Sequence, residues 1–421
     1  MIKQTYTSPR WSYEVTDCSM PMTFDTYSVC SFNCLYCFSF FQKSHCVGGY
    51  MDKLPRSVNV EYIKRLFNYG LQKDTEYKLN EEGKSFAKYI RNRKVMQWGG
   101  LSDPFDNFEK KYGITLELLE FFDEIDYPLS LSTKGVFWTK DDRYMSLFKK
   151  HTHNWHVKVS IITSNPFKAA ALERGVPSPT ERLEAIKELS DIGINTTLRL
   201  RPYIIGVSED YKDLIQKAHD AGANSVTTEF FCCEFRAGKE LKAKYKEISK
   251  YCGYDIQKFY TDNTKERSGL YRLNYTIKTP IINEMKQLAH NLNMRFYVSD
   301  AHHKEDSDFC CCCGVPPEWN VAKGHFAQAL QIAKQNGTVK WGDIKEGCSE
   351  ILGDVRMWNA PGYNIGGTKN RAQRYHQTLC DFLQELWNTP TAKNSPYRYF
   401  EGALTPLRLD ENNNIVYKYN R

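Results

Sequence analysis

The sequence predicts an α/β protein built on a partial (β/α)6 TIM-like barrel, extended at its carboxyl end by a region that carries cysteines. Two observations predict this fold. From about residue 90 to 300, short apolar runs alternate with amphipathic segments, the pattern of repeated β-α units around a parallel sheet. A cysteine-rich loop precedes this repeat, just after the place where an earlier strand would end.

Six apolar runs within the repeat predict parallel strands. They cover residues 95–98, 129–132, 157–162, 196–200, 225–230 and 295–299. With the earlier strand, this number suffices for a partial or a full barrel.

Helix signals separate the strands. Ser178 is a capping residue, Pro179 suits the first helical position and Glu181 completes a capping box, so a helix is expected from here until Gly193 ends it. By similar signals, Ser208 and Pro280 each open a helix.

Residues 236–278 interrupt this rhythm and predict an insertion. They hold eleven lysines and arginines against five acidic residues, with seven aromatic residues interleaved. Cations beside aromatic stacking platforms suit a nucleic-acid strand. The alternative is a solvated helical face whose aromatic side chains pack inward.

Beyond Asp300 the pattern changes to a cysteine run, a helix from about Gly324 to Asn336 closed by Gly337, and a final hairpin around residues 410–414. We therefore divide the chain into an amino-terminal segment (1–20), a core barrel (21–305) and a carboxyl-terminal region (306–421).

The composition is that of an ordinary folded protein, with 41% apolar and 25% charged residues in a chain of 421. The amino terminus has no apolar signal region and no stretch is long enough to span a membrane, so we expect a cytoplasmic protein. Its fourteen cysteines are then expected as thiols or metal ligands rather than disulfides. The net charge of +7 would not repel an anionic partner.

The strongest chemical signal is the spacing of Cys30, Cys34 and Cys37, with the aromatic Tyr36 before the last cysteine. Three thiolates on one tight loop can hold three irons of a 4Fe-4S cluster and leave the fourth iron open. That iron can take the amino and carboxylate groups of S-adenosylmethionine, whose sulfonium one electron then splits to give a 5′-deoxyadenosyl radical. The alternative is a zinc site completed by Cys18, Cys46 or His45, in a protein that binds nucleic acid without catalysis.

These residues, with six further segments, resemble the radical S-adenosylmethionine superfamily and within it the spore photoproduct lyase-like family. The matching segments are 98–105 (WGGLSDPF), 109–113 (EKKYG), 132–134 (STK), 159–161 (VSI) and 172–174 (LER) leading into 178–183 (SPTERL). The resemblance covers roughly residues 25 to 235, and it implies a barrel of the radical S-adenosylmethionine type.

The resemblance also implies roles for individual residues. Gly99 and Gly100 would let the backbone approach the methionine part of S-adenosylmethionine, and Ser102 and Asp103 would bind its amino group. Lys134 would pair with its carboxylate, and Ser160 would contact its ribose. A flavodoxin- or ferredoxin-type protein would supply the electron.

One departure from the lyase concerns its hydrogen-donating cysteine. The lyases hold it shortly before the serine that matches Ser102, whereas Gly99 and Gly100 stand there in this chain. Repair of a thymine dimer by the same route is therefore not expected. The substrate could be a nucleic acid, a peptide or a small metabolite.

A second cysteine group comprises Cys310, Cys311, Cys312 and Cys313, with Cys232 and Cys233 at a predicted strand end. Four consecutive residues cannot all face one metal, but two or three could combine with a distant cysteine such as Cys348 or one of the pair at 232. A second iron-sulfur cluster, a zinc site, a thiol that donates hydrogen to a substrate radical, and plain core packing all stay open.

Overall fold

An eight-stranded sheet forms the centre of the protein, in the order β12-β9-β8-β7-β6-β5-β3-β2. The structure, a computed structural model, describes residues 2–12, 16–43, 49–52, 54–234, 237–264, 270–356 and 377–421. The strands are β2 (Arg10–Trp11), β3 (Met22–Phe24), β5 (Met96–Trp98), β6 (Leu129–Thr133), β7 (Trp155–Ser160), β8 (Asn195–Tyr203), β9 (Ser225–Phe230) and β12 (Arg295–Val298). All six predicted strands are confirmed.

Every neighbouring pair in this sheet is parallel except β2 with β3. The strands at the two edges, β2 and β12, pair with no further strand of the described residues, so the sheet stays open. The architecture is thus a large, mostly parallel α/β sheet with the cysteine loop directly after β3, as the sequence predicts.

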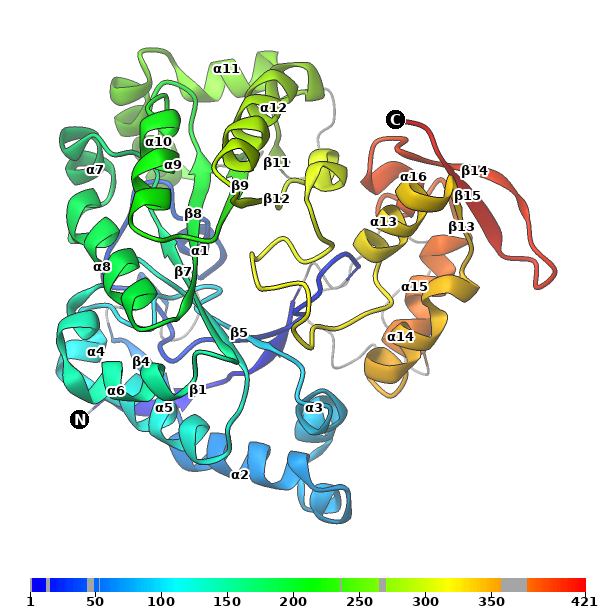
Figure 1. Cartoon of the computed structure of the whole chain (residues 1–421), viewed down its shortest axis with the longest axis horizontal. Coiled ribbons are helices and arrows are strands. Elements are labelled where there is room, and N and C mark those ends of the chain that lie inside the picture. The colour runs from blue at the N-terminus through cyan, green and yellow to red at the C-terminus, as the bar shows by residue number, and fades with distance from the viewer. Residues whose placement is uncertain are drawn as a thin grey trace.

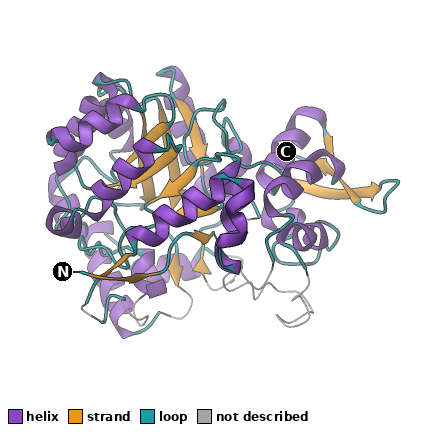
Figure 2. Ribbon diagram, turned by 90° about the horizontal axis from the view of Figure 1, so that it is seen from below, coloured by secondary structure: helices purple, strands orange, loops and turns teal. Residues whose placement is uncertain are grey.

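Helices cover the outside of the sheet, as Figures 1 and 2 show. They are α1 (Phe38–Lys43), α2 (Val60–Leu71), α3 (Glu81–Arg91), α4 (Asn107–Tyr112), α5 (Ile114–Glu124), α6 (Asp142–Lys150), α7 (Pro166–Leu172), α8 (Pro179–Asp191), α9 (Tyr211–Asp220) and α12 (Tyr275–Asn291). The predicted capping box of α8 is present, with Ser178 and Glu181 each bonded to the other's backbone N–H.

Two predicted helix starts are wrong. Helix α9 begins at Tyr211 rather than at Ser208, because the Ser208 hydroxyl accepts a hydrogen bond from the backbone N–H of Ile204 in the preceding turn. Helix α12 begins at Tyr275 and runs through Pro280. Proline there costs the helix one internal hydrogen bond, a loss that the tertiary packing of this helix offsets.

The predicted insertion forms α10 (Lys239–Cys252), α11 (Ile256–Asp262) and the short ladder of β10 (Cys233–Glu234) with β11 (Leu270–Tyr271). Its aromatic side chains pack mostly inward: Tyr245 and Tyr260 are buried against Phe231. Tyr251 is an exposed exception. The expected row of aromatic stacking platforms is therefore largely core.

The carboxyl-terminal region holds α13 (Phe326–Asn336), α14 (Gly342–Leu352), α15 (Leu379–Trp387) and α16 (Pro396–Tyr399) beside a small sheet of β13 (Thr338–Val339), β15 (Ile415–Tyr419) and β14 (Leu404–Leu409). The predicted closure of α13 by Gly337 and the hairpin at 410–414 are confirmed. This region lies to one side of the sheet (Figures 1 and 2). A further pair, β1 (Lys3–Tyr6) with β4 (Arg56–Val58), and three 3-10 turns at Lys73–Lys78, Phe137–Lys140 and Ala301–Asp306 complete the fold. In the part of the chain that the structure describes, no helix has the length and apolar character of a membrane span.

One face of the sheet is lined by polar side chains. A chain of hydrogen bonds crosses it from Ser130 to His156 (2.9 Å), from His156 to Thr197 (2.7 Å) and from Thr197 to Ser225 (2.7 Å). We call this the inner face. It is buried, so something other than solvent must cover it.

Candidate cluster and cofactor site

The three-cysteine loop leaves β3 at its carboxyl end, the end where barrel enzymes place their active sites. Asn33 adopts a left-handed conformation (φ 47°), and the backbone N–H of Leu35 donates to Leu172 O at 2.9 Å. The carboxylate of Asp106 accepts the backbone N–H of Ser31 at 2.5 Å. These contacts fold residues 30–37 into a tight turn held from two sides.

The thiols of this loop are shielded from water. Cys34 is buried, and Cys30 and Cys37 are half-buried. Burial raises the pKa of the Cys34 thiol to about 12, and burial beside Asp106 and Asp103 raises the pKa of Cys30 well above its ordinary value. A metal centre would have to displace these protons in order to bind thiolates.

A buried group of charged side chains stands beside the loop. The Tyr36 hydroxyl donates to Glu173, whose other oxygen accepts from Arg182 at 2.6 Å. The Lys134 ammonium lies 3.9 Å from Glu173 and 5.4 Å from the centre of the Tyr36 ring. Two cations thus share one carboxylate, which leaves a local surplus of one positive charge.

The loop after β5 passes close to the end of β6. Gly99 has φ 87°, and a Cβ there would lie 2.5 Å from Ser132 O. The half-buried Asp103 carboxylate accepts from the backbone N–H of Lys134 (2.6 Å) and from the hydroxyl of Thr133 (2.8 Å). Asp103 therefore holds the loop after β5 against the end of β6 and fixes the position of the Lys134 backbone.

Two of the expected cofactor contacts are engaged within the protein. The Ser102 hydroxyl donates to Tyr27 O at 2.7 Å, and the carboxylate of Asp103 is occupied as described above. By contrast, the buried Ser132 hydroxyl has no hydrogen-bond partner in the described structure. An unsatisfied polar atom here, beside the cradle at Gly99, fits a site that binds a polar ligand.

Ser160 ends β7 and links the charged group to the inner face. Its carbonyl accepts from Arg182 at 2.7 Å, and its hydroxyl accepts from Arg199 at 3.3 Å. Burial and the neighbouring Arg201 lower the pKa of Arg199 to about 10. Farther along the same strand ends, Arg201 forms an ion pair with Glu229 and donates to the Ser299 hydroxyl at 3.0 Å.

Helix α10 from the insertion also reaches the loop. The ammonium of Lys244 lies 3.6 Å above the ring of Phe40 and 3.4 Å from the Asn33 side chain. Burial lowers the pKa of Lys244, and the Cys37 and Cys34 thiols oppose that shift. The insertion thus contributes one wall of the site.

The structure brings the predicted site residues together on neighbouring strand ends: the cysteine triplet with Tyr36, Gly99, Lys134 and Ser160. The site residues that sequence reasoning missed are Asp106, Glu173, Arg182, Arg199 and Lys244. Arg199 had a usable signal, because Leu198, Arg199, Leu200 and Arg201 alternate and so place both arginines on one face of a strand. Cys46 and His45, considered as zinc ligands, lie outside the described residues.

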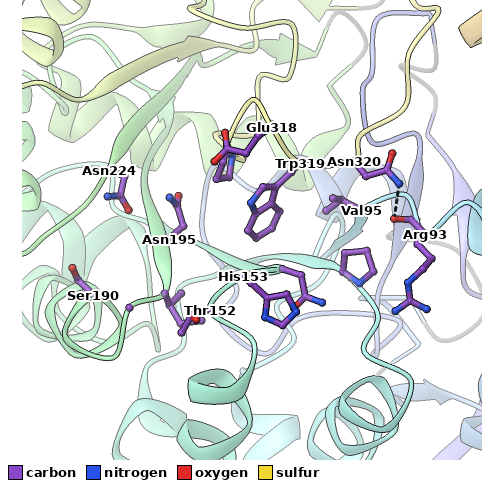
Figure 3. A pocket seen from close by; sticks show the side chains of 15 residues that line it. Arg93, Val95, Thr152, His153, Ser190, Asn195, Asn224, Glu318, Trp319 and Asn320 are labelled. Carbon is purple, nitrogen blue, oxygen red and sulfur yellow. Dashed lines mark hydrogen bonds between the residues drawn. The ribbon is translucent and has the colours of Figure 1, made fainter.

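A large pocket of about 660 Å³ lies elsewhere, where helices lead into the amino ends of the strands (Figure 3). It is lined by residues such as Thr152, Asn195 and Asn224, and Trp319 projects into the space between them. Because barrel active sites form at the opposite, carboxyl ends of strands, this pocket is not the candidate site.

Comparison with known proteins supports the fold. No family model matches the sequence. The uncharacterized protein Rv2578c of Mycobacterium tuberculosis is 24% identical over 266 residues, which cover 58% of this chain and 72% of that protein. Two structures of spore photoproduct lyase mutants superpose with a TM-score of 0.50, at 15% and 17% identity, over 70% of this chain and 80% of theirs. The chain therefore has the fold of spore photoproduct lyase, as the resemblance of its motifs predicts.

Proposed function

We propose that this protein is a radical S-adenosylmethionine enzyme in which Cys30, Cys34 and Cys37 hold a 4Fe-4S cluster. The observation that carries the proposal is the meeting of three shielded thiols with the Lys134 ammonium at the carboxyl end of a parallel sheet. When bound, the cluster supplies the one electron that splits a carbon-sulfur bond of S-adenosylmethionine and yields a 5′-deoxyadenosyl radical.

The spacing of the thiols favours a cluster over a single zinc ion. Thiolates around one tetrahedral zinc lie about 3.8 Å apart, given a zinc-sulfur distance of about 2.3 Å. Among the described residues, Asp126, His151 and His153 are the group of three whose ligand atoms all lie within 4.8 Å of one another. The sulfurs of Cys30, Cys34 and Cys37 therefore do not all lie within 4.8 Å of one another, which suits a multi-iron centre better than one zinc ion.

The residues around the loop suit S-adenosylmethionine. Its carboxylate would meet Lys134, whose charge Glu173 neutralises only in part because Arg182 shares that carboxylate. The backbone at Gly99 and Gly100 leaves room for the methionine part, and the unsatisfied hydroxyl of Ser132 offers a further contact. The engaged Ser102 and Asp103 would act mainly by holding this backbone in place.

For the substrate we propose a nucleic acid, bound across the mouth of the sheet. Its support is the exposed basic face of α10, where Lys242, Lys246 and Lys250 lie on the helix that carries Lys244 to the cluster loop. These lysines would neutralise phosphates of a bound strand. An oxygen-sensitive centre and a flavodoxin- or ferredoxin-type donor would suit a reducing compartment such as the cytoplasm.

Anaerobic reconstitution tests this function. Protein reduced with dithionite in the presence of S-adenosylmethionine is expected to release 5′-deoxyadenosine, and Cys34→Ala is expected to abolish that release. Cys252→Ala, which removes a buried thiol in α10, serves as the matched control and should retain it. Cleavage that survives in Cys34→Ala, or protein that holds zinc and no iron at the triplet, would overturn the proposal.

A further inference from the structure

The run of four cysteines lies against the inner face of the sheet. After β12 the chain turns back past the strands before it reaches α13, as the yellow segment in Figure 1 shows. The hydroxyl of Thr227 donates to Cys312 O at 2.7 Å, and the hydroxyl of Thr197 donates to Gly314 O at 3.4 Å. This run is therefore the element that covers the buried polar face.

Gly314 makes this close approach possible. It has φ 80°, and a Cβ there would lie 2.4 Å from the Thr197 hydroxyl. The turn at Gly314 places the preceding cysteines between the sheet and the amino-terminal segment. Cys311 and Cys313 are buried there with Met20, Val95 and other apolar residues.

Several thiols meet at this place. The Cys313 thiol is hydrogen-bonded to those of Cys311 and Cys312, and it lies 3.7 Å from the Gln97 side chain. Cys18, far away in the sequence, packs against the same group of buried residues. Cys310 points elsewhere, toward the Ser19 hydroxyl at 3.8 Å.

The other distant cysteines are not part of this group. Cys348 is hydrogen-bonded to Cys380 in the carboxyl-terminal region, and Cys232 lies beside Arg272 and Glu229 at the mouth of the sheet. Of the two partners that the sequence suggests for the cysteine run, neither is in place, whereas Cys18 packs against it.

A buried cation faces these thiols. Lys158 lies on the inner face, paired in register with Thr197, and its ammonium is buried with no hydrogen-bond partner in the described structure. The side chains of Cys311, Cys312 and Cys313 are its neighbours on this face. An unpaired ammonium in a dry interior is costly, so a full anionic charge among the thiols would stabilise it.

We infer that Cys18, Cys311, Cys312 and Cys313 hold a second iron-sulfur cluster, for which Lys158 is the buried counter-cation. Four thiolates are the usual ligand set of such a cluster. Each thiol gives its proton to solvent when it binds iron, and the anionic centre that results compensates the charge of Lys158.

The spacing of these thiols does not by itself separate an iron-sulfur cluster from a single zinc ion. Within the described residues, no three of the sulfur atoms all lie within 4.8 Å of one another, yet Cys313 is hydrogen-bonded to both Cys311 and Cys312. The metal content of the reconstituted protein separates the two.

The first test removes the other cluster. Full-length protein with Cys30, Cys34 and Cys37 all changed to alanine is reconstituted anaerobically with iron and sulfide. We expect it to retain about four irons per chain and a visible iron-sulfur spectrum, against about eight irons in the unmodified protein. A triple variant that retains no iron, or one that retains a single zinc, would overturn the inference.

The second test removes the proposed ligands. Cys312→Ala with Cys313→Ala is expected to halve the iron content of otherwise unmodified protein while cleavage of S-adenosylmethionine continues. Cys310→Ala is the matched control, since its thiol faces Ser19, and it should keep the full iron content. An unchanged iron content in the double variant would contradict the proposed ligand set.

A third variant tests the role of Lys158 while it leaves all the proposed cysteine ligands of the second cluster in place. Lys158→Met keeps the length and packing of the side chain but removes its charge, and it is expected to lose iron from the second site faster on exposure to a chelator. The readout is iron release from protein that already lacks the first three cysteines. Release at an unchanged rate would show that Lys158 does not compensate a cluster.

Discussion

At the scale of single residues, Glu173 organises the site. Its carboxylate accepts from Tyr36 on the cysteine loop and from Arg182 on α8, and it lies 3.9 Å from Lys134. The cations keep the pKa of Glu173 below its usual value although the residue is fully buried. A single acid thus places the loop, a helix and Lys134 relative to one another.

Replacing Glu173 by glutamine is expected to destabilise the cluster-loaded protein by about 3–5 kcal/mol, because the fully buried Arg182 would lose its counter-charge. The measurement is the urea dependence of unfolding under anaerobic conditions. The control is Glu184→Gln, which changes an exposed acid on α8, the helix that carries Arg182. It should change stability by less than about 0.5 kcal/mol. Equal effects of the two changes would show that the buried pair does not anchor the site.

His156 makes stability depend on pH. Burial and the nearby Lys158 keep the pKa of His156 well below its ordinary value, so the folded protein leaves it neutral. The unfolded chain binds a proton there below about pH 6.5. Acidification below that pH therefore favours unfolding, by up to about 1.4 kcal/mol per pH unit from this residue.

Between pH 6.5 and 5, we expect the free energy of unfolding to fall more steeply with acidification in the unmodified protein than in His156→Gln. The difference in slope corresponds to about one additional proton bound on unfolding. Anaerobic urea unfolding at a series of pH values measures the slope. His219→Gln, which changes a more exposed histidine, should leave the slope as it is. A slope that His156→Gln does not reduce would contradict a neutral, buried His156.

The residues of the site differ in how far the sequence reveals them. Cys30, Cys34 and Cys37 can be recognised from their spacing, because thiols proposed to hold one cluster stand close together in the sequence on one loop. Glu173, Arg182 and Asp106 do not, since their partners lie 9 to 137 positions away and no local pattern records which carboxylate meets which cation. Long-range pairing is a product of the fold.

At the scale of elements, the junctions between strands and helices control the site. Gly99 is expected to tolerate no side chain, since φ 87° is unfavourable for alanine and its Cβ would lie 2.5 Å from Ser132 O. Gly99→Ala should lower cluster retention and cleavage of S-adenosylmethionine at least tenfold. Gly113→Ala has a similar φ of 67° but open space, so it should cost only about 1–2 kcal/mol of stability and keep activity.

Strands were easier to place from the sequence than helix starts. The six strands are buried in one sheet, and strands of this kind are short runs of mostly apolar residues that can be recognised in the sequence. The starts at Ser208 and Pro280 depend instead on which hydrogen bonds compete. The Ser208 hydroxyl accepts a hydrogen bond from the backbone N–H of Ile204 instead of capping α9. Helix α12 continues through Pro280 because its packing in the fold offsets the lost hydrogen bond. Neither outcome is set by the local sequence.

At the scale of the whole molecule, the insertion and the carboxyl-terminal region contact the core at different places. Helix α10 brings Lys244 to the three-cysteine loop, and the cysteine run packs on the inner face of the sheet. Polar contacts join the segment of α14 to α3: Lys88 pairs with Asp354 (3.1 Å) and Asn92 with Glu350 (3.1 Å). The sequence predicts these segments as separate regions but contains no local sign of where they dock.

The basic face of α10 gives the test of the proposed substrate class. Changing Lys242, Lys246 and Lys250 to glutamate is expected to weaken binding of single-stranded DNA at least tenfold and to reduce its salt slope by about two, because each phosphate contact contributes about 0.7. Filter binding from 50 to 200 mM salt would measure both quantities. The same reversal at Lys149, Lys187 and Lys217, exposed on α6, α8 and α9, changes the net charge equally and controls for long-range attraction. If both triple variants lose affinity alike, the strand is attracted by overall charge and the exposed face of α10 is not its binding site.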